Sequence, residues 1–453
     1  MDLPPLPIDR RLPRSLAGQL ADGLRAAAIA GVLRPGDRLP STRSLSAQLE
    51  LSRTVCAAAY DQLLAEGWLA TRRGSGTFVV GVPAPGAVIP SASRPVPASL
   101  PGPRTPRPVL SLRAGVPCLA VLDRGMWRRA WRDAADAPVE RASDPEGLPP
   151  FRAAVVEHLL RHRGLPCDPE LVLATAGSTA ALAEIGAVLP AGVPVAVENP
   201  GYAGGASALR SAGRELVGVP VDADGIVVDA IPEGVSAVMV TPAHQYPLGA
   251  RLSAARRVEL VDRARRDGLL IVEDDYDGEL RYDVAPLPLL AALGPDVVVH
   301  LGTVSKMLTP GLGCGWLVAP PAVRAELVRR RAATGTRPSA AGQRVVTALA
   351  AHGDLARHLR RLRRELARRR AEVVAVVRGT GRLAMGDAAG AHVVVEVEDE
   401  RAVIAAAAAR GVELDGLARH YLGPPERQGL VVGYAGPTPD ELSAALRVLA
   451  HVL

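Results

Sequence analysis

Lys306 is the only lysine in a chain whose lysine and arginine residues together number 53. Arginine stays protonated wherever charge alone is needed, whereas the amine of a lysine can form a Schiff base with an aldehyde. A compositional bias towards arginine explains the rarity of lysine, and a lone lysine after a strand is commonly a surface residue. The residues predicted to surround Lys306 therefore decide between a reactive amine and a surface charge.

Four short segments carry side chains that can act together with Lys306. A pyridoxal phosphate site needs a lysine for the aldehyde and a carboxylate at the pyridine nitrogen. It also needs a hydroxyl donor, a flat group on the ring face and helix N-terminal amides for the phosphate. These groups occur in Glu273-Asp274-Asp275-Tyr276, Gly177-Ser178-Thr179, Asn199-Pro200-Gly201-Tyr202 and Gly302-Thr303-Val304-Ser305-Lys306. Each segment alone is equally well explained as a helix cap or a packing residue, so spacing by itself does not name the cofactor.

Brief, valine-rich apolar runs precede several of these segments. They cover residues 193–197, 237–240, 269–272 and 297–301, and their unalternating pattern is typical of strands buried on both faces. The helical patterns between them predict crossover connections, a largely parallel sheet and therefore an α/β fold. Ligands of such sheets bind at the carboxyl ends of the strands, so we expect the candidate residues to converge there.

A leucine stripe at helical spacing, Leu355, Leu359, Leu362 and Leu366, predicts a long helix surrounded by arginines. We interpret its arginines as a solvated basic face, and the alternative is a secondary surface for the DNA backbone. Residues from about 380 to 453 are expected to form a small α+β domain that closes the chain.

The first 80 residues predict a separate unit of three helices and a hairpin. Ser41 and Ser52 can cap helices over residues 42–50 and 53–66, with helix-turn-helix spacing between them. Two short strands around the basic, glycine-rich turn at 72–76 predict a wing.

Several polar residues of this unit can contact DNA. The first residues of a recognition helix, here Ser52, Arg53 and Thr54, reach base edges in the major groove. Arg43 and Arg53 can bond bidentately to guanine or phosphate, and Arg72 on the wing can contact the backbone or the minor groove. The alternative is an ordinary three-helix unit with solvated arginines.

Composition separates the chain into three segments and excludes some classes of protein. Residues 81–108 are proline-rich and predict a semi-rigid linker between the unit at 1–80 and the α/β segment at 109–453. A net charge of +6 does not by itself establish nucleic-acid binding. The four cysteines lie far apart, without metal-ligand spacing, and are expected to be reduced thiols in the cytoplasm. We see no signal peptide and no apolar run long enough for a membrane helix.

The N-terminal unit resembles the GntR-type winged helix over nearly all of residues 14–80. The resemblance rests on Leu33-Arg34-Pro35-Gly36-Asp37-Arg38-Leu39-Pro40-Ser41-Thr42-Arg43, Leu51-Ser52-Arg53-Thr54-Val55 and Gly74-Ser75-Gly76-Thr77-Phe78-Val79. It implies binding to operator DNA, with Arg43, Arg53, Thr54 and the wing glycines Gly74 and Gly76 at the contact surface.

Residues 109–453 resemble fold-type I aminotransferases, and the whole chain resembles the MocR-type regulators, which join a GntR winged helix to such a domain. The matching stretches are Thr241-Pro242-Ala243-His244-Gln245-Tyr246-Pro247-Leu248-Gly249, Glu273-Asp274-Asp275-Tyr276-Asp277-Gly278-Glu279, Arg281-Tyr282, Gly302-Thr303-Val304-Ser305-Lys306, Tyr421 and Gly433-Tyr434-Ala435.

This second resemblance implies a role for each candidate residue. Lys306 would be the Schiff-base lysine, Asp274 would face the pyridine nitrogen, Tyr276 the ring hydroxyl, and Tyr202 would stack on the ring. The residues implied near the phosphate or the ring are Ser178, Thr179, Thr303, Ser305 and His244. The resemblance also implies a homodimer with its site near the subunit interface.

Three departures from the family pattern affect the phosphate site. Gly313 stands where relatives carry an arginine seven residues after the lysine, and Ala142 stands where they carry a tyrosine. Thr179 and Ala180 replace a pair of glutamines. A charge-assisted hydrogen bond contributes about 1.5–3 kcal/mol, so we expect pyridoxal phosphate to bind roughly ten- to a hundred-fold more weakly unless another group replaces the cation.

The sequence thus predicts a cytoplasmic transcription regulator that binds operator DNA and senses pyridoxal phosphate, or an amine or amino-acid effector, at Lys306. One alternative is a working pyridoxal-phosphate-dependent aminotransferase with an appended DNA-binding domain. Another is a regulator whose pocket has lost pyridoxal phosphate and binds a different ligand.

Overall fold

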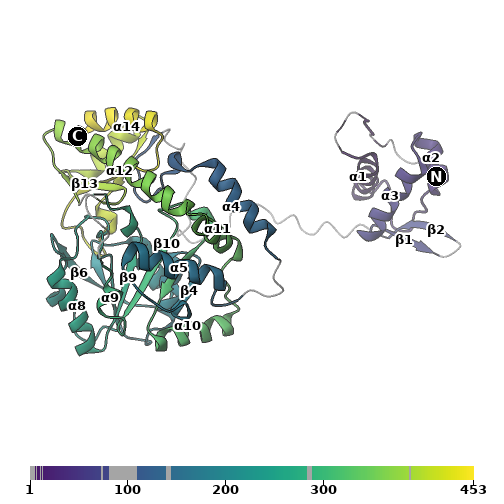
Figure 1. Cartoon of the computed structure of the whole chain (residues 1–453). Coiled ribbons are helices and arrows are strands. Elements are labelled where there is room, and N and C mark those ends of the chain that lie inside the picture. The colour runs from purple at the N-terminus through teal and green to yellow at the C-terminus, as the bar shows by residue number, and fades with distance from the viewer. Residues whose placement is uncertain are drawn as a thin grey trace. The chain divides into compact units, whose positions relative to one another are not determined.

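The computed structural model describes residues 6, 8–10, 12, 14–72, 75–80, 110–138, 144–282, 288–386 and 389–453. The predicted linker at 81–108 therefore lies outside the described residues, as do Gly74 and Ala142. The chain divides into two compact units, Met1–Thr105 and Pro106–Leu453 (Figure 1).

The first unit contains the predicted helix-turn-helix and wing. Its elements are α1 (Leu16–Ile29), α2 (Thr42–Leu49), α3 (Arg53–Ala65), β1 (Leu69–Arg72) and β2 (Gly76–Val79), with β1 and β2 antiparallel. The hydroxyls of Ser41 and Ser52 accept hydrogen bonds from Ser44 N and Val55 N, which confirms both predicted caps. Glu50 ends α2 in the left-handed conformation with φ 52°, and this reverses the chain before α3.

A single small core holds the first unit together. Leu20, Leu24, Leu45 and Leu63 come from the three helices and pack with Val79 of the wing, all of them almost completely buried. Apolar side chains of each helix therefore join the three helices to the wing.

The second unit is built on an eight-stranded sheet with the order β4-β11-β10-β9-β8-β5-β6-β7 in the part of the chain that the structure describes. The strands are β4 (Val172–Thr175), β5 (Val195–Asn199), β6 (Leu216–Asp222), β7 (Gly225–Ile226), β8 (Ala237–Val240), β9 (Leu270–Asp275), β10 (Val298–Thr303) and β11 (Gly315–Val318). Strands β6, β5, β8, β9 and β10 are parallel, as predicted. Strand β11 runs antiparallel between β10 and β4.

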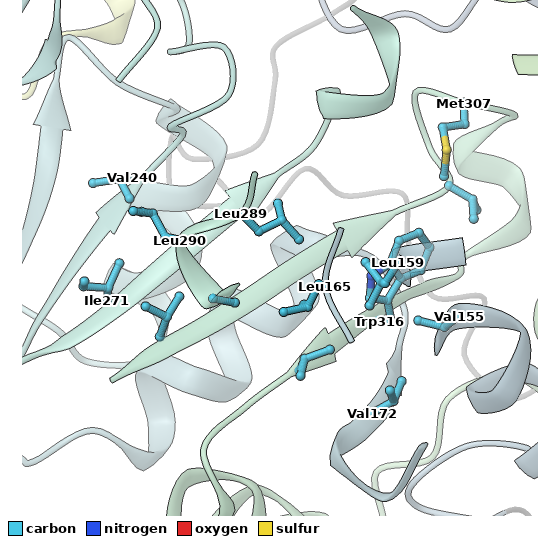
Figure 2. Packing of buried hydrophobic residues seen from close by; sticks show 14 of the residues in the cluster. Val155, Leu159, Leu165, Val172, Val240, Ile271, Leu289, Leu290, Met307 and Trp316 are labelled. Atoms are coloured by element: carbon cyan, nitrogen blue, oxygen red, sulfur yellow. The ribbon is translucent and has the colours of Figure 1, made fainter. Parts of the chain in front are cut away.

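Helices cover both faces of this sheet: α4 (Arg124–Asp136), α5 (Pro149–Arg163), α6 (Ser178–Val188), α7 (Ala203–Ser211), α8 (Ala254–Asp267), α9 (Leu290–Leu293), α10 (Pro321–Thr334) and α11 (Ala340–Ala351). Neighbouring strand residues enter different cores, since Ile271 packs with α5 and α8 whereas Val272 packs with α6 and α7. Figure 2 shows the first of these cores, where Trp316 of β11 lies against Leu159 of α5.

A smaller, four-stranded sheet follows the long helix α12 (Asp354–Gly379). Its order is β12 (Ala384–Met385), β13 (His392–Glu396), β16 (Gly429–Gly433) and β15 (Asp415–Gly416), with α13 (Glu400–Ala408) and α14 (Pro439–Val452) alongside. Its core also takes in Leu112 and the α12 residues Leu362 and Leu366. Strand β3 (Leu110–Ser111) pairs with β14 (Val412–Glu413), so the residues just after the predicted linker belong to this smaller layer.

The interpretation of the arginines of α12 as a solvated face is wrong for Arg369. This side chain is fully buried, and its Nη1 donates to the carbonyl oxygens of Tyr434, Ala435 and Pro437 at 3.0, 2.9 and 2.6 Å. Carbonyl groups beyond the end of β16 need donors, and a buried guanidinium supplies them. Arg360 and Arg364 are exposed as predicted. Among the described helices, none combines the length and the apolar character needed to cross a membrane.

Candidate functional site

A cavity of about 340 Å³ lies at the carboxyl ends of β9 and β10. Eight of the predicted cofactor residues line it: Ser178, Thr179, Tyr202, Asp274, Tyr276, Thr303, Ser305 and Lys306. The ninth, His244, stands behind the wall, where its Nδ1 lies 3.2 Å from the hydroxyl of Tyr276. The convergence that the strand pattern predicted is therefore present, while the role of each residue stays a prediction.

Lys306 follows β10 and reaches across to the chain segment that enters the small sheet. Its Nζ donates a hydrogen bond of 2.7 Å to the carbonyl oxygen of Gly115. Burial lowers the pKa of this amine, and the nearby carboxylates Asp277 and Asp274 partly oppose that shift. A lowered pKa increases the fraction of neutral amine, which is the nucleophilic form.

Asp274 at the end of β9 is the most unusual group in the cavity. It is 1% exposed, and neither carboxylate oxygen has a hydrogen-bond partner among the described residues. Burial and the neighbouring Asp275 raise its pKa to about 7. An unpartnered buried carboxylate is costly, so this position is suited to a ligand that brings a proton donor, such as a pyridine ring nitrogen.

The direction of Asp274 is set by its neighbour. Successive side chains of a strand point to opposite faces, and Asp275 points away from the cavity to a buried guanidinium. Arg163 of α5 binds Asp275 through Nε and Nη2 at 2.8 and 2.7 Å, and its side chain is 0% exposed. Bidentate pairing of this kind fixes geometry as well as charge, so Arg163 holds the end of β9 in place.

Tyr276, His244 and Asp277 form a hydrogen-bonded group beside the ring position. His244 Nδ1 lies 2.9 Å from Asp277 Oδ2, and the Tyr276 hydroxyl donates to the backbone oxygen of His244 at 3.1 Å. Burial raises the pKa of Tyr276 well above its usual value, so its hydroxyl stays protonated. Its single hydrogen could turn from the backbone oxygen of His244 to an anionic ring oxygen.

Tyr246 is a cavity residue to which the sequence reasoning gave no role. Its ring makes edge contacts with Tyr202, Tyr276, His392 and His420, with centroid distances from 5.1 to 5.9 Å. Burial lowers the pKa of His392 to about 3 and that of His420 to about 4, so both rings are neutral. Tyr246 lies within the stretch 241–249 that resembles the family, and this resemblance could have identified it as a site residue.

The end of the cavity suited to a phosphate offers hydroxyls and backbone amides. Gly177 precedes α6 with φ 119°, and Ser178 and Thr179 form its first turn. The Thr303 hydroxyl donates to Ser305 Oγ at 3.0 Å, and the Thr179 hydroxyl lies 3.0 Å from that of Tyr202. A helix N-terminus favours anions.

Among the described lining residues, the cations are Lys306 and Arg419. Gly313, which stands where relatives carry an arginine, has φ 52° at the end of the short helix η5 (Pro310–Leu312) and is not part of the lining. The residues present therefore fit the amine, ring and hydroxyl positions of pyridoxal phosphate. For its phosphate they offer hydroxyls and the N-terminus of α6, without the additional arginine.

The predicted DNA-contacting residues lie at the surface of the first unit. Arg43 in α2, Arg53 and Thr54 at the start of α3, and Arg72 and Gly76 on the wing are exposed. The hydroxyl of Ser52 already caps α3, so it has a structural task as well as its predicted one. Gly76 has φ 114°, and an added Cβ would meet Arg38 Nε at 3.0 Å. Gly74 lies outside the described residues.

Comparison with known proteins gives matches for both units. The family of bacterial regulatory proteins named gntR matches residues 16–79, and the aminotransferase class I and II family matches residues 107–442. The chain is similar in structure to an archaeal alanine:glyoxylate aminotransferase, with a TM-score of 0.71, 23% identity and coverage of 76% of this chain and 90% of that one. This likeness shows the fold of the second unit.

Two regulators match along almost the full length. The HTH-type pyridoxine biosynthesis transcriptional regulator PdxR of Corynebacterium glutamicum is 36% identical, over 99% of this chain and 98% of that protein. The probable rhizopine catabolism regulatory protein MocR of Rhizobium meliloti is 34% identical, over 98% of this chain and 95% of that protein. The chain therefore belongs to the MocR-type subfamily of GntR transcription regulators, with a winged helix-turn-helix joined to a fold-type I aminotransferase domain.

Proposed function

We propose that this regulator uses its aminotransferase-like domain to sense pyridoxal phosphate, or an amine or amino acid, through Lys306. The observation that carries the proposal is Asp274, a buried carboxylate without a described partner that shares one cavity with the only lysine of the chain. Neither oxygen of Asp274 has a partner among the described residues, whereas a cofactor with a protonated ring nitrogen would supply one.

Pyridoxal phosphate supplies an aldehyde for covalent binding and a ring that accepts electrons. In the proposed site Lys306 would bind the aldehyde carbon, and Asp274 would keep a proton at the ring nitrogen. Tyr276 would donate to the ring oxygen, and Tyr202 would cover one ring face. The amides and hydroxyls at the start of α6 would hold the phosphate.

Absorbance spectroscopy of the purified chain tests this proposal directly. Wild type incubated with pyridoxal phosphate is expected to acquire the visible band of lysine-bound cofactor, and Lys306→Ala is expected to lack it. Circular dichroism must show that the variant is folded. A wild type without the band after incubation would contradict the proposal and favour the alternative of a regulator whose pocket binds another ligand.

A second candidate, an active aminotransferase, is favoured by one observation. Lys306, Asp274 and Tyr276, the residues that catalysis would need, are all present in the cavity. Consumption of an amino donor over many turnovers by wild type, absent in Lys306→Ala, would support the enzyme. Spectral change that stops after one equivalent would support the sensor. The phosphate end without the additional arginine leads us to expect the latter.

The output of the sensor is expected at the winged helix. The protein would bind operator DNA as a homodimer, through Arg43, Arg53, Thr54 and Arg72 of each subunit. The two-fold symmetry of the dimer would then match two half-sites of the operator. A ligand shifts such a complex only if it binds one conformation better than the other. Sedimentation of the purified chain, with and without pyridoxal phosphate, measures the proposed dimer.

A further inference from the structure

A second carboxylate, Asp277, lies in the cavity that Lys306 enters. It follows the end of β9 by two positions, its side chain is 3% exposed, and it lines the cavity together with Asp274. His244 Nδ1 lies 2.9 Å from Oδ2 of Asp277, whereas Oδ1 has no hydrogen-bond partner among the described residues. A buried carboxylate is costly unless donors or an opposite charge compensate it, so a nearby cation is expected to balance Asp277.

The start of the small sheet covers Asp277 and fixes its place. A Cβ added at Gly390, two residues before β13, would lie 2.5 Å from Oδ2 of Asp277 and 2.5 Å from Cε1 of His244. The amide of Gly390 donates to the carbonyl oxygen of Leu280 at 3.0 Å, which holds this backbone against the segment that follows β9. The charge of Asp277 is therefore kept inside the wall of the cavity.

Most of the other titratable side chains that line the cavity carry no charge near neutral pH. Burial raises the pKa of one thiol and three phenols, and it lowers the pKa of one imidazole to about 3. These groups are Cys118, Tyr202, Tyr246, Tyr276 and His392. The positive charge of Lys306 contributes to the lowered pKa of His392, so the amine lies near β13, on the side of the cavity where Asp277 is covered.

The charged side chains of the described lining are Lys306, Arg419, Asp274 and Asp277. Arg419 pairs at 3.1 Å with Asp415, which lies outside the lining and also feels the charge of Arg113. The charges that act on the amine of Lys306 come from Asp277 and, to a smaller extent, from Asp274. In the proposed site Asp274 faces the ring nitrogen, so Asp277 is the acid that remains for the amine.

We propose that Asp277 is the counter-ion of Lys306, and that it favours a proton on the lysine nitrogen both in the free amine and after this nitrogen has bound an aldehyde carbon. The inference deepens the proposed function, because Lys306 is the reactive group of that function. The unprotonated amine is the nucleophile, so a counter-ion sets the pH above which Lys306 can react. Asp277 thus acts through Lys306 as a positioning residue for charge.

The amine can be titrated by itself because Lys306 is the only lysine of the chain. Full-length, cofactor-free protein grown with lysine that carries 13C at Cε gives one lysine signal in a carbon–proton NMR spectrum, and its change with pH reports the protonation of Nζ. Asp277→Asn and Asp277→Ser are expected to lower the midpoint by roughly one to two pH units, a ten- to hundred-fold weaker binding of the proton. Asp277→Glu retains the charge and is expected to titrate close to wild type.

Two further variants separate a charge effect from a structural one. Asp415→Asn makes the same change at another buried acid, outside the lining, and is expected to leave the midpoint unchanged. Asp274→Asn is expected to lower it by less than Asp277→Asn does. A wild-type midpoint in the folded neutral variants of Asp277, or an equal drop in Asp415→Asn, overturns the assignment. The titration needs no cofactor, so a wild type that lacks the visible band would contradict the proposed cofactor site and leave this result standing.

Discussion

Asp274 combines complete burial, an unpartnered carboxylate and a pKa raised to about 7. Its ordinary pKa is 3.8, so between these two values the native protein binds a proton that the unfolded chain has released. The free energy of unfolding of the cofactor-free protein therefore falls as the pH rises through this window. The loss is complete above about pH 7 and amounts to roughly 4 kcal/mol, since each pKa unit corresponds to about 1.36 kcal/mol.

Asp274→Asn removes the titrating group and keeps its shape. The melting temperature of the cofactor-free variant, relative to that of wild type, is expected to increase from pH 4 to pH 7 and then to level off. Any fixed cost of burying an amide shifts the whole curve and leaves its slope unchanged. Thermal unfolding at several pH values measures the difference, and a difference that does not vary with pH would mean that Asp274 is not protonated in the native state.

At the scale of elements, the junction between α5 and β9 depends on a buried ion pair. Arg163→Met leaves the carboxylate of Asp275 buried without its partner, and breaking such a pair costs about 3–5 kcal/mol. The matched control is Arg265→Met, because Arg265 and Asp296 form an exposed pair at 2.7 Å and exposed pairs contribute less than about 1 kcal/mol. Urea unfolding measures the free energy of unfolding of both variants. Equal losses in the two would show that the buried pair of Arg163 and Asp275 contributes no more to stability than an exposed pair.

The start of α3 separates a structural residue from a recognition residue. Ser52 caps the helix, so Ser52→Ala is expected to destabilise it by about 1 kcal/mol, which corresponds to roughly fivefold faster amide exchange in residues 53–65. Thr54 is exposed and makes no cap, so Thr54→Ala is expected to leave exchange unchanged and to weaken DNA binding. Hydrogen–deuterium exchange measures the stability of α3, and fluorescence anisotropy measures DNA binding. Unchanged exchange in Ser52→Ala, or unchanged DNA binding in Thr54→Ala, would contradict these roles.

At the scale of the whole molecule, the salt dependence of DNA binding is set by the cations that contact phosphates more than by the net charge of +6. A phosphate contact releases counterions and adds about one unit to the dependence of log K on log salt. Arg72→Gln is expected to lower this slope by about one for a random-sequence duplex. Arg427→Gln, which changes the net charge equally in the other unit, is expected to leave it unchanged. Equal slopes in all three proteins would remove Arg72 from the proposed interface.

Local patterns explain which parts of this architecture were predictable. The caps Ser41 and Ser52 and the four apolar strand runs depend on neighbouring residues, and the structure confirms them within a few positions. Strand β11 has the same apolar character as its parallel neighbours, so its reversed direction has no signature in the sequence. Tyr246, Arg369 and Arg419 acquire their surroundings from segments distant along the chain. Residue type and spacing therefore gave Tyr246 and Arg419 no role and placed Arg369 on a solvated basic face.

The hydrogen bond from Lys306 to Gly115 has a consequence for signalling. A lysine nitrogen bound to an aldehyde carbon as a Schiff base keeps at most one hydrogen, so its bond to the Gly115 carbonyl oxygen, 2.7 Å long here, would compete with any other acceptor of that hydrogen. Gly115 lies a few positions after β3, the first described element of its unit, and the chain before β3 leads back to the winged helix. Binding of an aldehyde at Lys306 would therefore change a contact to backbone that follows, along the chain, the connection to the winged helix.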